Sequence, residues 1–397
     1  MFRSKGGGVI DHLGHTLTIS VTQSATSRRT AAVGVSEEAR AKATTAARSG
    51  RRPLIGRSHK GRRMAAGAVL SVAGTMWSVF GTTLGVSAGS APQQPTQPAD
   101  GPGGRSGYIA SSITRYETES GSDGTRVWWF VPDRLKNGSS APVVVYLHGF
   151  MLLAPDIYKG HIDHHARQGY IVVYPQFNKG GLTGLLTDND QEKMLRRAID
   201  ATNVALARLG SKADRGRLHL FGHSLGGLMA GTWSGYGGPA PASVTIANPS
   251  LDTSASVPSF VRSFVRITPI DHQTAARANR ARTVILTGDA DTIAKPAEAV
   301  QFHDEMTNAP RRSVFQALSD RRGTPPIEAD HMAPIQNSGL VPDFMMRLFG
   351  GVARTDTLDF RFYWSALDQN IAGVAEPVFT MGAWSDGVPV RSPIRLR

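Results

Sequence analysis

One ten-residue segment constrains this chain more than any other: residues 218–227, with the sequence LHLFGHSLGG. An apolar run typical of a buried strand leads into a Gly-x-Ser-x-Gly turn, and the residues that follow, up to Trp233, are compatible with a helix. A sharp strand-to-helix turn strains the backbone of its central residue, so glycines two positions before and after it are needed to avoid collisions. The segment therefore predicts that Ser224 stands at the mouth of a sheet as a nucleophile, with an ordinary Gly/Ser turn as the alternative.

Two later segments supply the partners that a nucleophilic serine needs. Residues 283–287 predict a buried strand that ends at Gly-Asp-Ala-Asp, where a carboxylate would stand at the strand's C-terminal end. Residues 328–334 predict a loop that carries His331. Serine needs a base to accept its proton and a carboxylate to hold that base in the right tautomer. The order Ser224, Asp291, His331 therefore predicts a catalytic triad.

From about Tyr108 to the C-terminus, the chain resembles α/β-hydrolases of the lipase, esterase and cutinase type. Three motifs carry the resemblance: the His-Gly turn after Tyr146 and Leu147, the Gly-His-Ser-Leu-Gly-Gly elbow, and the later Asp and His loops. It implies an α/β-hydrolase fold, with a mainly parallel central sheet covered by helices on both faces. It also implies cleavage of carboxylic esters through an acyl-enzyme. An acyltransferase, a serine peptidase or a non-catalytic binding protein could share this fold.

The acid of the triad has two candidates. Asp291 lies three residues after Gly288, which matches the Gly-x-x-Asp placement of the acid in this family. Asp289 is the competitor, although aspartates are common in turns for local reasons. Asp291 is the preferred assignment.

The oxyanion hole is predicted by the same resemblance. Residues 142–147 form a β-branched run that predicts a central strand, and the turn that leaves it is His148-Gly149-Phe150. In hydrolases with this arrangement, one backbone N–H comes from the residue after the nucleophile and the other from this turn, which implicates Leu225 and Phe150. His148 is interpreted as a structural residue that bonds to nearby backbone.

A group of histidines, His161, His164 and His165, has a spacing that could suggest a metal site. On a helix, residues three or four apart share a face, so His161 could chelate an ion with either of the others, and Asp163 could assist weakly. No second cluster with ligand spacing supports this interpretation. The group is interpreted as a solvated helix face, and no metal or organic cofactor is predicted.

The remaining elements alternate as the α/β class requires. Strands are predicted at residues 126–131, 143–147, 170–175, 218–221, 244–247, 283–287 and 314–317. The clearest helix is predicted at residues 190–209. Residues 251–281 predict either a small lid with a short helix, built from Val257, Phe260, Val261, Phe264, Val265 and Ile267, or ordinary connecting structure. Residues 382–390 predict a compact turn that packs Trp384 on the body.

Charge is distributed unevenly along the chain. The net charge of +13 and the pI of 10.3 would ordinarily suggest a nucleic-acid partner. However, residues 1–63 hold 13 of the 44 basic and 3 of the 31 acidic residues, and residues 64–88 hold none. The remainder therefore carries 31 basic and 28 acidic residues, which is close to neutral. An ester or lipid-like small molecule is the predicted partner, and nucleic acid is not.

The first hundred residues divide into three predicted regions. Residues 57–63 are basic, residues 64–88 are uncharged and end in small residues, and together they predict a secretory signal peptide, with an uncleaved membrane anchor as the alternative. Residues 1–63 are predicted to be a disordered basic extension, which suggests a true start near Met64 or a little upstream. Residues 89–107 are predicted to be an extended, disordered linker before a catalytic domain at residues 108–397.

Cysteine is absent from the sequence, which excludes disulfides, a lipoprotein anchor and thiolate zinc sites. This also departs from many cutinase-like enzymes, which carry disulfides. The predicted location is secreted or at the cell surface, with the membrane serving only as the export route or as an N-terminal anchor.

Overall fold

The computed structural model describes residues 90–121, 123–252, 254, 265–336, 339 and 342–397. The predicted basic extension and signal peptide lie outside these residues. Among the described residues, nine strands form one sheet in the order β1-β2-β4-β3-β5-β6-β7-β8-β9. The strands are β1 (Ile113–Glu119), β2 (Arg126–Pro132), β3 (Ala141–Leu147), β4 (Ile171–Pro175), β5 (Ala213–His223), β6 (Ser243–Ala247), β7 (Arg282–Gly288), β8 (Arg312–Ala317) and β9 (Ile394–Arg395). Strands β4, β3, β5, β6, β7 and β8 pair in parallel, and β1, β2 and β9 pair antiparallel at the two edges.

Most helices lie in the connections between parallel strands, and the last two lie between β8 and the antiparallel β9. They are α1 (Lys159–Arg167), α2 (Gly181–Thr187), α3 (Gln191–Leu209), α4 (Leu225–Thr232), α6 (His272–Ala276), α7 (Pro296–Glu305), α8 (Asp343–Leu348) and α9 (Trp364–Ile371). Short 3-10 helices occupy η2 (Pro155–Tyr158), η3 (Gly210–Lys212) and η4 (Trp233–Tyr236), and the π-helix η6 (Asp359–Tyr363) precedes α9. Within the described parts of the chain, no helix has the length and apolar character needed to cross a membrane.

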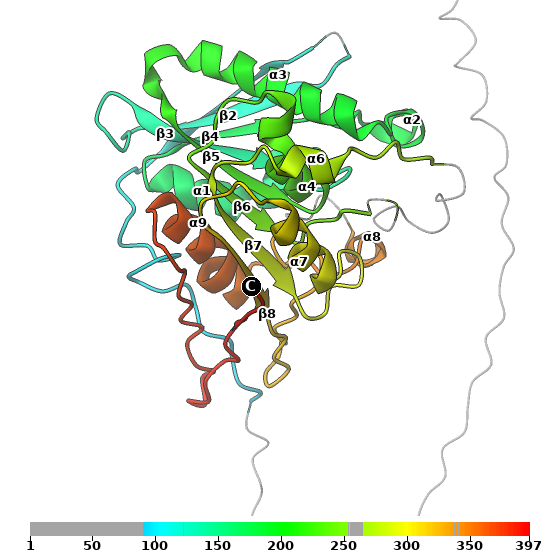
Figure 1. Ribbon diagram of the computed structural model, residues 1–397. Helices are drawn as coiled ribbons and strands as arrows, with labels where there is room; N and C mark the ends of the chain where they lie inside the picture. The colour runs from blue at the N-terminus through cyan, green and yellow to red at the C-terminus, as the bar shows by residue number, and fades with distance from the viewer. Residues whose placement is uncertain (1–89, 122, 253, 255–264, 337–338, 340–341) are drawn as a thin grey trace, which may run out of the picture. The chain divides into compact units, whose positions relative to one another are not determined.

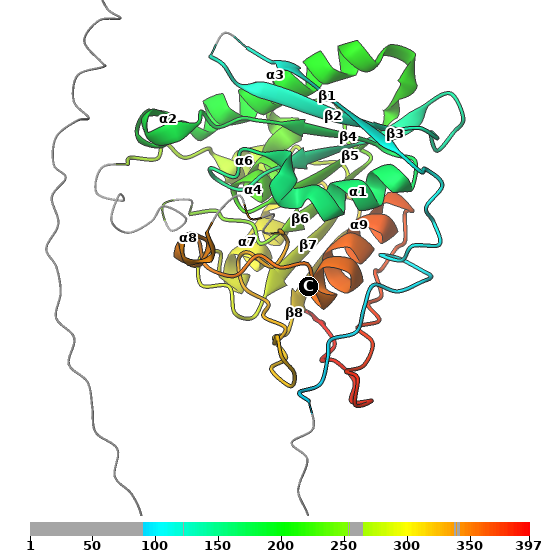
Figure 2. The same ribbon diagram turned by 180° about the vertical axis from the view of Figure 1, so that it is seen from behind.

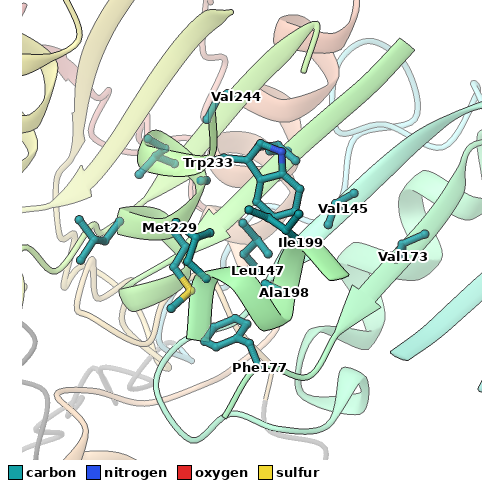
Figure 3. Packing of buried hydrophobic residues seen from close by; sticks show 14 of the residues in the cluster. Val145, Leu147, Val173, Phe177, Ala198, Ile199, Met229, Trp233 and Val244 are labelled. Atoms are coloured by element: carbon teal, nitrogen blue, oxygen red, sulfur yellow. The ribbon is translucent and has the colours of Figure 1, made fainter. Parts of the chain in front are cut away.

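The sheet separates two apolar cores. Successive side chains of a strand point to opposite faces, and β3 follows this rule: Val143, Val145 and Leu147 belong to one core, and Val144 and Tyr146 to the other. The first core is covered by α3, α4, α6 and α7 (Figure 1), and Figure 3 shows Ala198 and Ile199 of α3 near Val145 and Leu147. The second core is covered by α1 and α9 (Figure 2). The predicted α/β-hydrolase fold, with helices on both faces of a mainly parallel sheet, is therefore confirmed.

The predicted inner strands and the long helix are confirmed within a few residues at their ends. Helix α3 begins where expected because Asp190 accepts a hydrogen bond from the Lys193 amide at 3.1 Å, which caps the first turn. The two edge strands β1 and β9 were not predicted. Most residues of β1 (ITRYETE) are exposed, so it lacks the apolar alternation that marks a half-buried strand.

The prediction of a disordered linker at residues 89–107 is wrong for the residues that the structure describes. Residues 90–107, here called the N-terminal strap, run along the body beside the C-terminal part of the chain (Figure 1). Hydrogen bonds join Gln93 to Ser385, Thr96 to Arg361, and Gly103 to Asp368. A Cβ at Gly103 would lie 1.7 Å from the Phe360 carbonyl oxygen, so only glycine fits there. The extended chain is ordered because its backbone groups find partners on the body.

Two further predictions concern loops. Residues 253 and 255–264 of the proposed lid, which include Val257, Phe260, Val261 and Phe264, lie outside the described residues, and the described remainder contains α6. The compact turn at residues 382–390 is confirmed. The Trp384 indole is buried, and its Nε1 donates a hydrogen bond to Asp320 Oδ2 at 3.0 Å.

Candidate active site

The strand-to-helix elbow has the strained geometry that the sequence predicts. Ser224 lies between β5 and α4 with φ 56° and ψ −121°, a conformation that a non-glycine residue rarely adopts. A Cβ at Gly222 would lie 2.1 Å from the Gly226 carbonyl oxygen, and one at Gly226 would lie 2.0 Å from the Leu147 carbonyl oxygen. Both glycines are therefore required because the elbow packs tightly against itself and against β3.

The parallel strands bring the three predicted triad residues together at their carboxyl ends. The Ser224 Oγ lies 2.9 Å from His331 Nε2, and His331 Nδ1 lies 2.8 Å from Asp291 Oδ2. All three side chains are buried. The second carboxylate oxygen of Asp291 accepts hydrogen bonds from the Ile293 and Ala294 amides at 2.9 and 2.8 Å, so the carboxyl group is held on both sides.

The rival acid Asp289 lies away from this arrangement. It is exposed, and its Oδ1 accepts hydrogen bonds from the backbone amide and the hydroxyl of Ser319 at 2.9 and 2.6 Å. Asp289 thus fastens the end of β7 to the loop after β8, and it makes no contact with His331 among its described interactions.

Two backbone amides close to Ser224 have no partner among the groups that the structure describes. Within the described structure, the amides of Phe150 and Leu225 donate no hydrogen bond. The carbonyl of Gly149 accepts hydrogen bonds from His148 Nδ1 at 2.7 Å and from the Leu152 amide at 3.0 Å. Because C=O and N–H point in opposite directions across a trans peptide, the Phe150 N–H points away from His148. The amides that sequence reasoning selected are therefore available for an external acceptor.

His148 bonds to nearby backbone groups, as predicted for a structural residue. Its Nδ1 donates to the adjacent Gly149 carbonyl, and its Nε2 accepts a long hydrogen bond from the Phe177 amide at 3.4 Å. The imidazole is stacked on the Phe177 ring with 3.8 Å between centroids. Burial lowers the pKa of His148 to about 4, so the ring is neutral at pH 7.

A small cavity opens over the Ser224 hydroxyl, and its free space of about 10 Å³ is enough for roughly one water molecule. Its polar lining comes from Gly149, His223, Ser224 and His331. The apolar lining consists of the side chains of Phe150, Leu152, Met332 and Phe349. No Asp, Glu, Lys or Arg is among these described lining residues, so the cavity suits a neutral and apolar group.

The interpretation of the three histidines as a solvated helix face is wrong. His161, His164 and His165 are all buried between α1 and α9. His164 Nε2 lies 3.0 Å from one carboxylate oxygen of Asp368, and His165 Nε2 lies 3.2 Å from the other. Sequence reasoning missed this arrangement because Asp368 lies about two hundred residues later in the chain. These three residues, His164, His165 and Asp368, are called the histidine latch below.

The histidine latch could hold a metal ion by the spacing of its ligand atoms, which lie within 4.8 Å of one another. However, the carboxylate of Asp368 is already the acceptor for the Gly103 amide at 2.7 Å and for Gln168 Nε2 at 3.0 and 3.1 Å. Asp163, the predicted assisting ligand, forms an ion pair with Lys159 instead. The Asp368 carboxylate is therefore already occupied by the chain's own donors, and the latch joins the N-terminal strap to α1 and α9.

Comparison with known proteins agrees with this description in part of the chain. Residues 124–234, which include the oxyanion turn and Ser224, match the family model described as chlorophyllase. No curated protein matches the chain. Similar solved structures include an esterase of Pyrococcus furiosus, with 17% identity over 60% of this chain and 88% of that chain and a TM-score of 0.41.

Two further solved structures show similarity of the same order. Fungal esterases from Rhizomucor miehei are represented by a structure with 10% identity, coverage of 67% of this chain and 86% of that chain, and a TM-score of 0.44. The acylaminoacyl peptidase of Pyrococcus horikoshii shows 16% identity and a TM-score of 0.43, and the match covers 61% of this chain but only 42% of that chain. The strand order, the elbow and the chain of contacts from Ser224 to Asp291 therefore carry the assignment of the fold.

Proposed function

We propose that this protein, a serine hydrolase of the α/β-hydrolase fold, cleaves carboxylic esters through an acyl-enzyme at Ser224. The observation that carries the proposal is the continuous contact from the Ser224 hydroxyl through His331 to Asp291, beside two backbone amides that donate no hydrogen bond within the described part of the chain. The match of residues 124–234 to the chlorophyllase model supports an esterase, because the matched segment contains the nucleophile and the oxyanion turn.

The geometry suits each step of acyl transfer. His331 Nε2 takes the proton of Ser224 as the serine oxygen bonds to the ester carbonyl carbon, and the carbonyl oxygen becomes an oxyanion. The Phe150 and Leu225 amides stabilise that oxyanion. His331 then gives its proton to the departing alcohol, which leaves an acyl group on Ser224. Water attacks this acyl group with His331 again as the base, and the acid product is released as Ser224 regains its proton.

The lining of the cavity favours a short acyl group over a peptide. Apolar contact is offered by Phe150, Leu152, Met332 and Phe349. The described lining residues include no charged side chain that would recognise a peptide terminus. The free space of about 10 Å³ is far below that of an ordinary small-molecule site, so the cavity has room for only the shortest acyl chains and must widen for longer ones. We expect turnover of 4-nitrophenyl esters to decrease as the acyl chain lengthens from acetate to decanoate.

Replacement of Ser224 with Ala tests the function directly. We expect kcat for 4-nitrophenyl butyrate to fall by at least ~10⁴-fold, because the nucleophile is removed. Labelling by a fluorophosphonate probe should be stoichiometric in the wild type and absent in Ser224→Ala. Ser139→Ala, at an exposed serine, serves as the control and should label like the wild type. Folded wild-type protein that neither labels nor turns over esters would favour a non-catalytic binding protein, and faster turnover of an anilide would favour a peptidase.

We also propose that the enzyme is exported, on the sequence pattern of residues 57–88 alone. N-terminal sequencing of protein recovered outside the cells tests this. A first residue close to Gly89 supports cleavage of a signal peptide, whereas intact protein retained in the cell contradicts export.

A further inference from the structure

A chain of three buried hydrogen bonds connects the oxyanion turn with the backbone of His331. The Gly149 amide donates to the Tyr158 hydroxyl oxygen at 3.0 Å, and this hydroxyl lies 2.8 Å from His223 Nδ1. On its other side, His223 Nε2 lies 2.8 Å from the carbonyl oxygen of His331. Tyr158 and His223 are both fully buried. These four residues are called the tyrosine–histidine relay, and the predicted triad and oxyanion hole did not include Tyr158 or His223.

The direction of every bond in the relay follows from one protonation state. The His331 carbonyl can only accept, so His223 Nε2 must carry a hydrogen and donate it. Burial lowers the pKa of His223 to about 3, so the ring is neutral and its Nδ1 has only a lone pair. The Tyr158 hydroxyl must therefore donate to Nδ1, and its oxygen is left to accept from the Gly149 amide. A single tautomer satisfies all three bonds.

Both ends of the relay lie on, or next to, a residue that acts on the substrate. Gly149 immediately precedes Phe150, whose free amide faces away from His148. The carbonyl at the other end belongs to His331 itself, and it also accepts a hydrogen bond from Asn248 Nδ2 at 3.3 Å. His223 is the residue directly before Ser224, so the relay runs through the nucleophile's immediate neighbour in the chain. The relay thus connects the proposed oxyanion hole and the base through the side chains of two other segments.

We propose that Tyr158 and His223 are positioning residues, which hold the Phe150 amide and the His331 imidazole at the separation that the tetrahedral intermediate requires. This inference rests on the proposed ester hydrolysis. Misplacement of a catalytic group by about 1 Å can cost roughly a hundredfold in rate. Loss of a relay bond therefore lowers the stabilisation of the intermediate, and binding of the ground-state ester is affected little.

A buried hydrogen-bond network can also exist only for stability, and the chain offers a matched control for that case. Tyr146 is a second buried tyrosine whose hydroxyl contacts a histidine, His165 Nδ1, at 2.9 Å. Its hydroxyl points into the space between β3 and α1, away from Ser224. Tyr146→Phe and Tyr158→Phe thus delete the same chemical group from two similar bonds, of which only one belongs to the relay.

The test compares these two variants with the wild type on 4-nitrophenyl butyrate and on butylboronic acid, which forms a tetrahedral adduct with an activated serine. We expect Tyr158→Phe to lower kcat/KM by roughly 10- to 100-fold and to weaken boronic acid binding by a similar factor, with KM changed by less than about threefold. Tyr146→Phe should lower the melting temperature to a similar extent and leave the boronic acid affinity unchanged.

Two substitutions of His223 separate the ends of the relay. In His223→Asn the amide oxygen can replace Nδ1 as the acceptor for Tyr158, but the bond to the His331 carbonyl is lost. In His223→Gln the longer side chain can donate to that carbonyl, but the acceptor for Tyr158 is lost. We expect both variants to lower kcat/KM and to change KM much less, because each variant breaks one hydrogen bond of the relay. If Tyr158→Phe does not fold, these two variants still test whether the relay positions the catalytic groups.

Each outcome decides between the proposals. A wild type that neither turns over esters nor binds the boronic acid overturns both the ester hydrolysis and the relay. An active wild type with unchanged boronic acid affinity in Tyr158→Phe and in both His223 variants overturns the relay alone. The relay is also overturned if Tyr158→Phe and Tyr146→Phe lower kcat/KM and melting temperature in parallel, because the effect would then be one of stability.

Discussion

Asp291→Asn is expected to lower kcat for ester hydrolysis by about 10⁴-fold and to leave the protein folded. The Oδ1 of Asp291 accepts hydrogen bonds from the Ile293 and Ala294 amides, so an asparagine keeps its carbonyl oxygen at that position. Its NH₂ group then faces His331 Nδ1 in place of the acceptor that lies there in the wild type at 2.8 Å. His331 must then carry its proton on Nε2, where it cannot accept the proton of Ser224.

Asp289→Asn is the matched control, because Asp289 directly follows the same strand, β7, and was the rival candidate for the acid. It is exposed and bonds to Ser319, so its replacement should change kcat by less than about threefold. Steady-state kinetics of both variants, with melting temperatures to confirm folding, make the comparison. A larger loss of kcat in Asp289→Asn than in Asp291→Asn would show that the acid is wrongly assigned.

The elements of the site that could be predicted from the sequence are those determined by a few neighbouring residues. The glycines around Ser224 are required by contacts within the elbow and with β3. This requirement is visible in the sequence as the Gly-x-Ser-x-Gly pattern. Asp291 was preferred to Asp289 because its place three residues after Gly288 resembles that of the acid in α/β-hydrolases, and Asp291 is the residue that lies 2.8 Å from His331 Nδ1.

Interactions between distant segments could not be predicted in the same way. The burial of His164 and His165 depends on Asp368 of α9, and nothing in the sequence around α1 indicates a carboxylate partner. The spacing of the histidines correctly indicates that they lie on one helix, but polar side chains on a helix are usually solvated. Burial became favourable here only because hydrogen-bond partners from another segment are present.

The order of the N-terminal strap is a second feature that the local sequence could not predict. Its sequence is rich in proline and glutamine and has no apolar periodicity, which is typical of a disordered linker. Its order comes from backbone and amide hydrogen bonds to the body, such as those of Thr96 to Arg361 and of Gly103 to Asp368. Backbone groups are the same in every sequence, so composition does not reveal where they will find partners.

The second large effect is expected for Asp368→Ala, which should lower the free energy of unfolding by about 3–5 kcal/mol. Asp368 accepts hydrogen bonds from the Gly103 amide and Gln168 Nε2, and its carboxylate lies beside His164 and His165. Removal of this one acceptor leaves buried donors from the N-terminal strap and α1 without a partner. Urea unfolding measures the loss, and faster proteolysis of residues 90–107 would indicate release of the strap.

The matched control is Asp304→Ala, which removes the acid of an exposed Asp–His pair. Asp304 lies 2.8 Å from His303 Nδ1, but its side chain is 55% exposed, so its replacement should cost less than about 1 kcal/mol. Equal effects of the two substitutions would contradict the view that burial of the histidine latch makes Asp368 important. In both variants kcat should match the wild type wherever the protein is folded, because neither residue contacts the triad.

The pH dependence of the Asp368→Ala effect has a definite sign. Burial alone would raise the pKa of Asp368, but the neighbouring His164 and His165 hold it well below its ordinary value. A carboxyl group whose pKa is lowered by folding binds fewer protons in the folded state, so it stabilises the fold above the ordinary aspartate pKa of about 4. This contribution is lost as the pH falls through the lowered pKa.

The difference in unfolding free energy between wild type and Asp368→Ala should therefore be constant from about pH 5 upward and decrease in more acidic solution. A difference that increased as the pH fell below 4 would show that Asp368 is protonated in the folded protein.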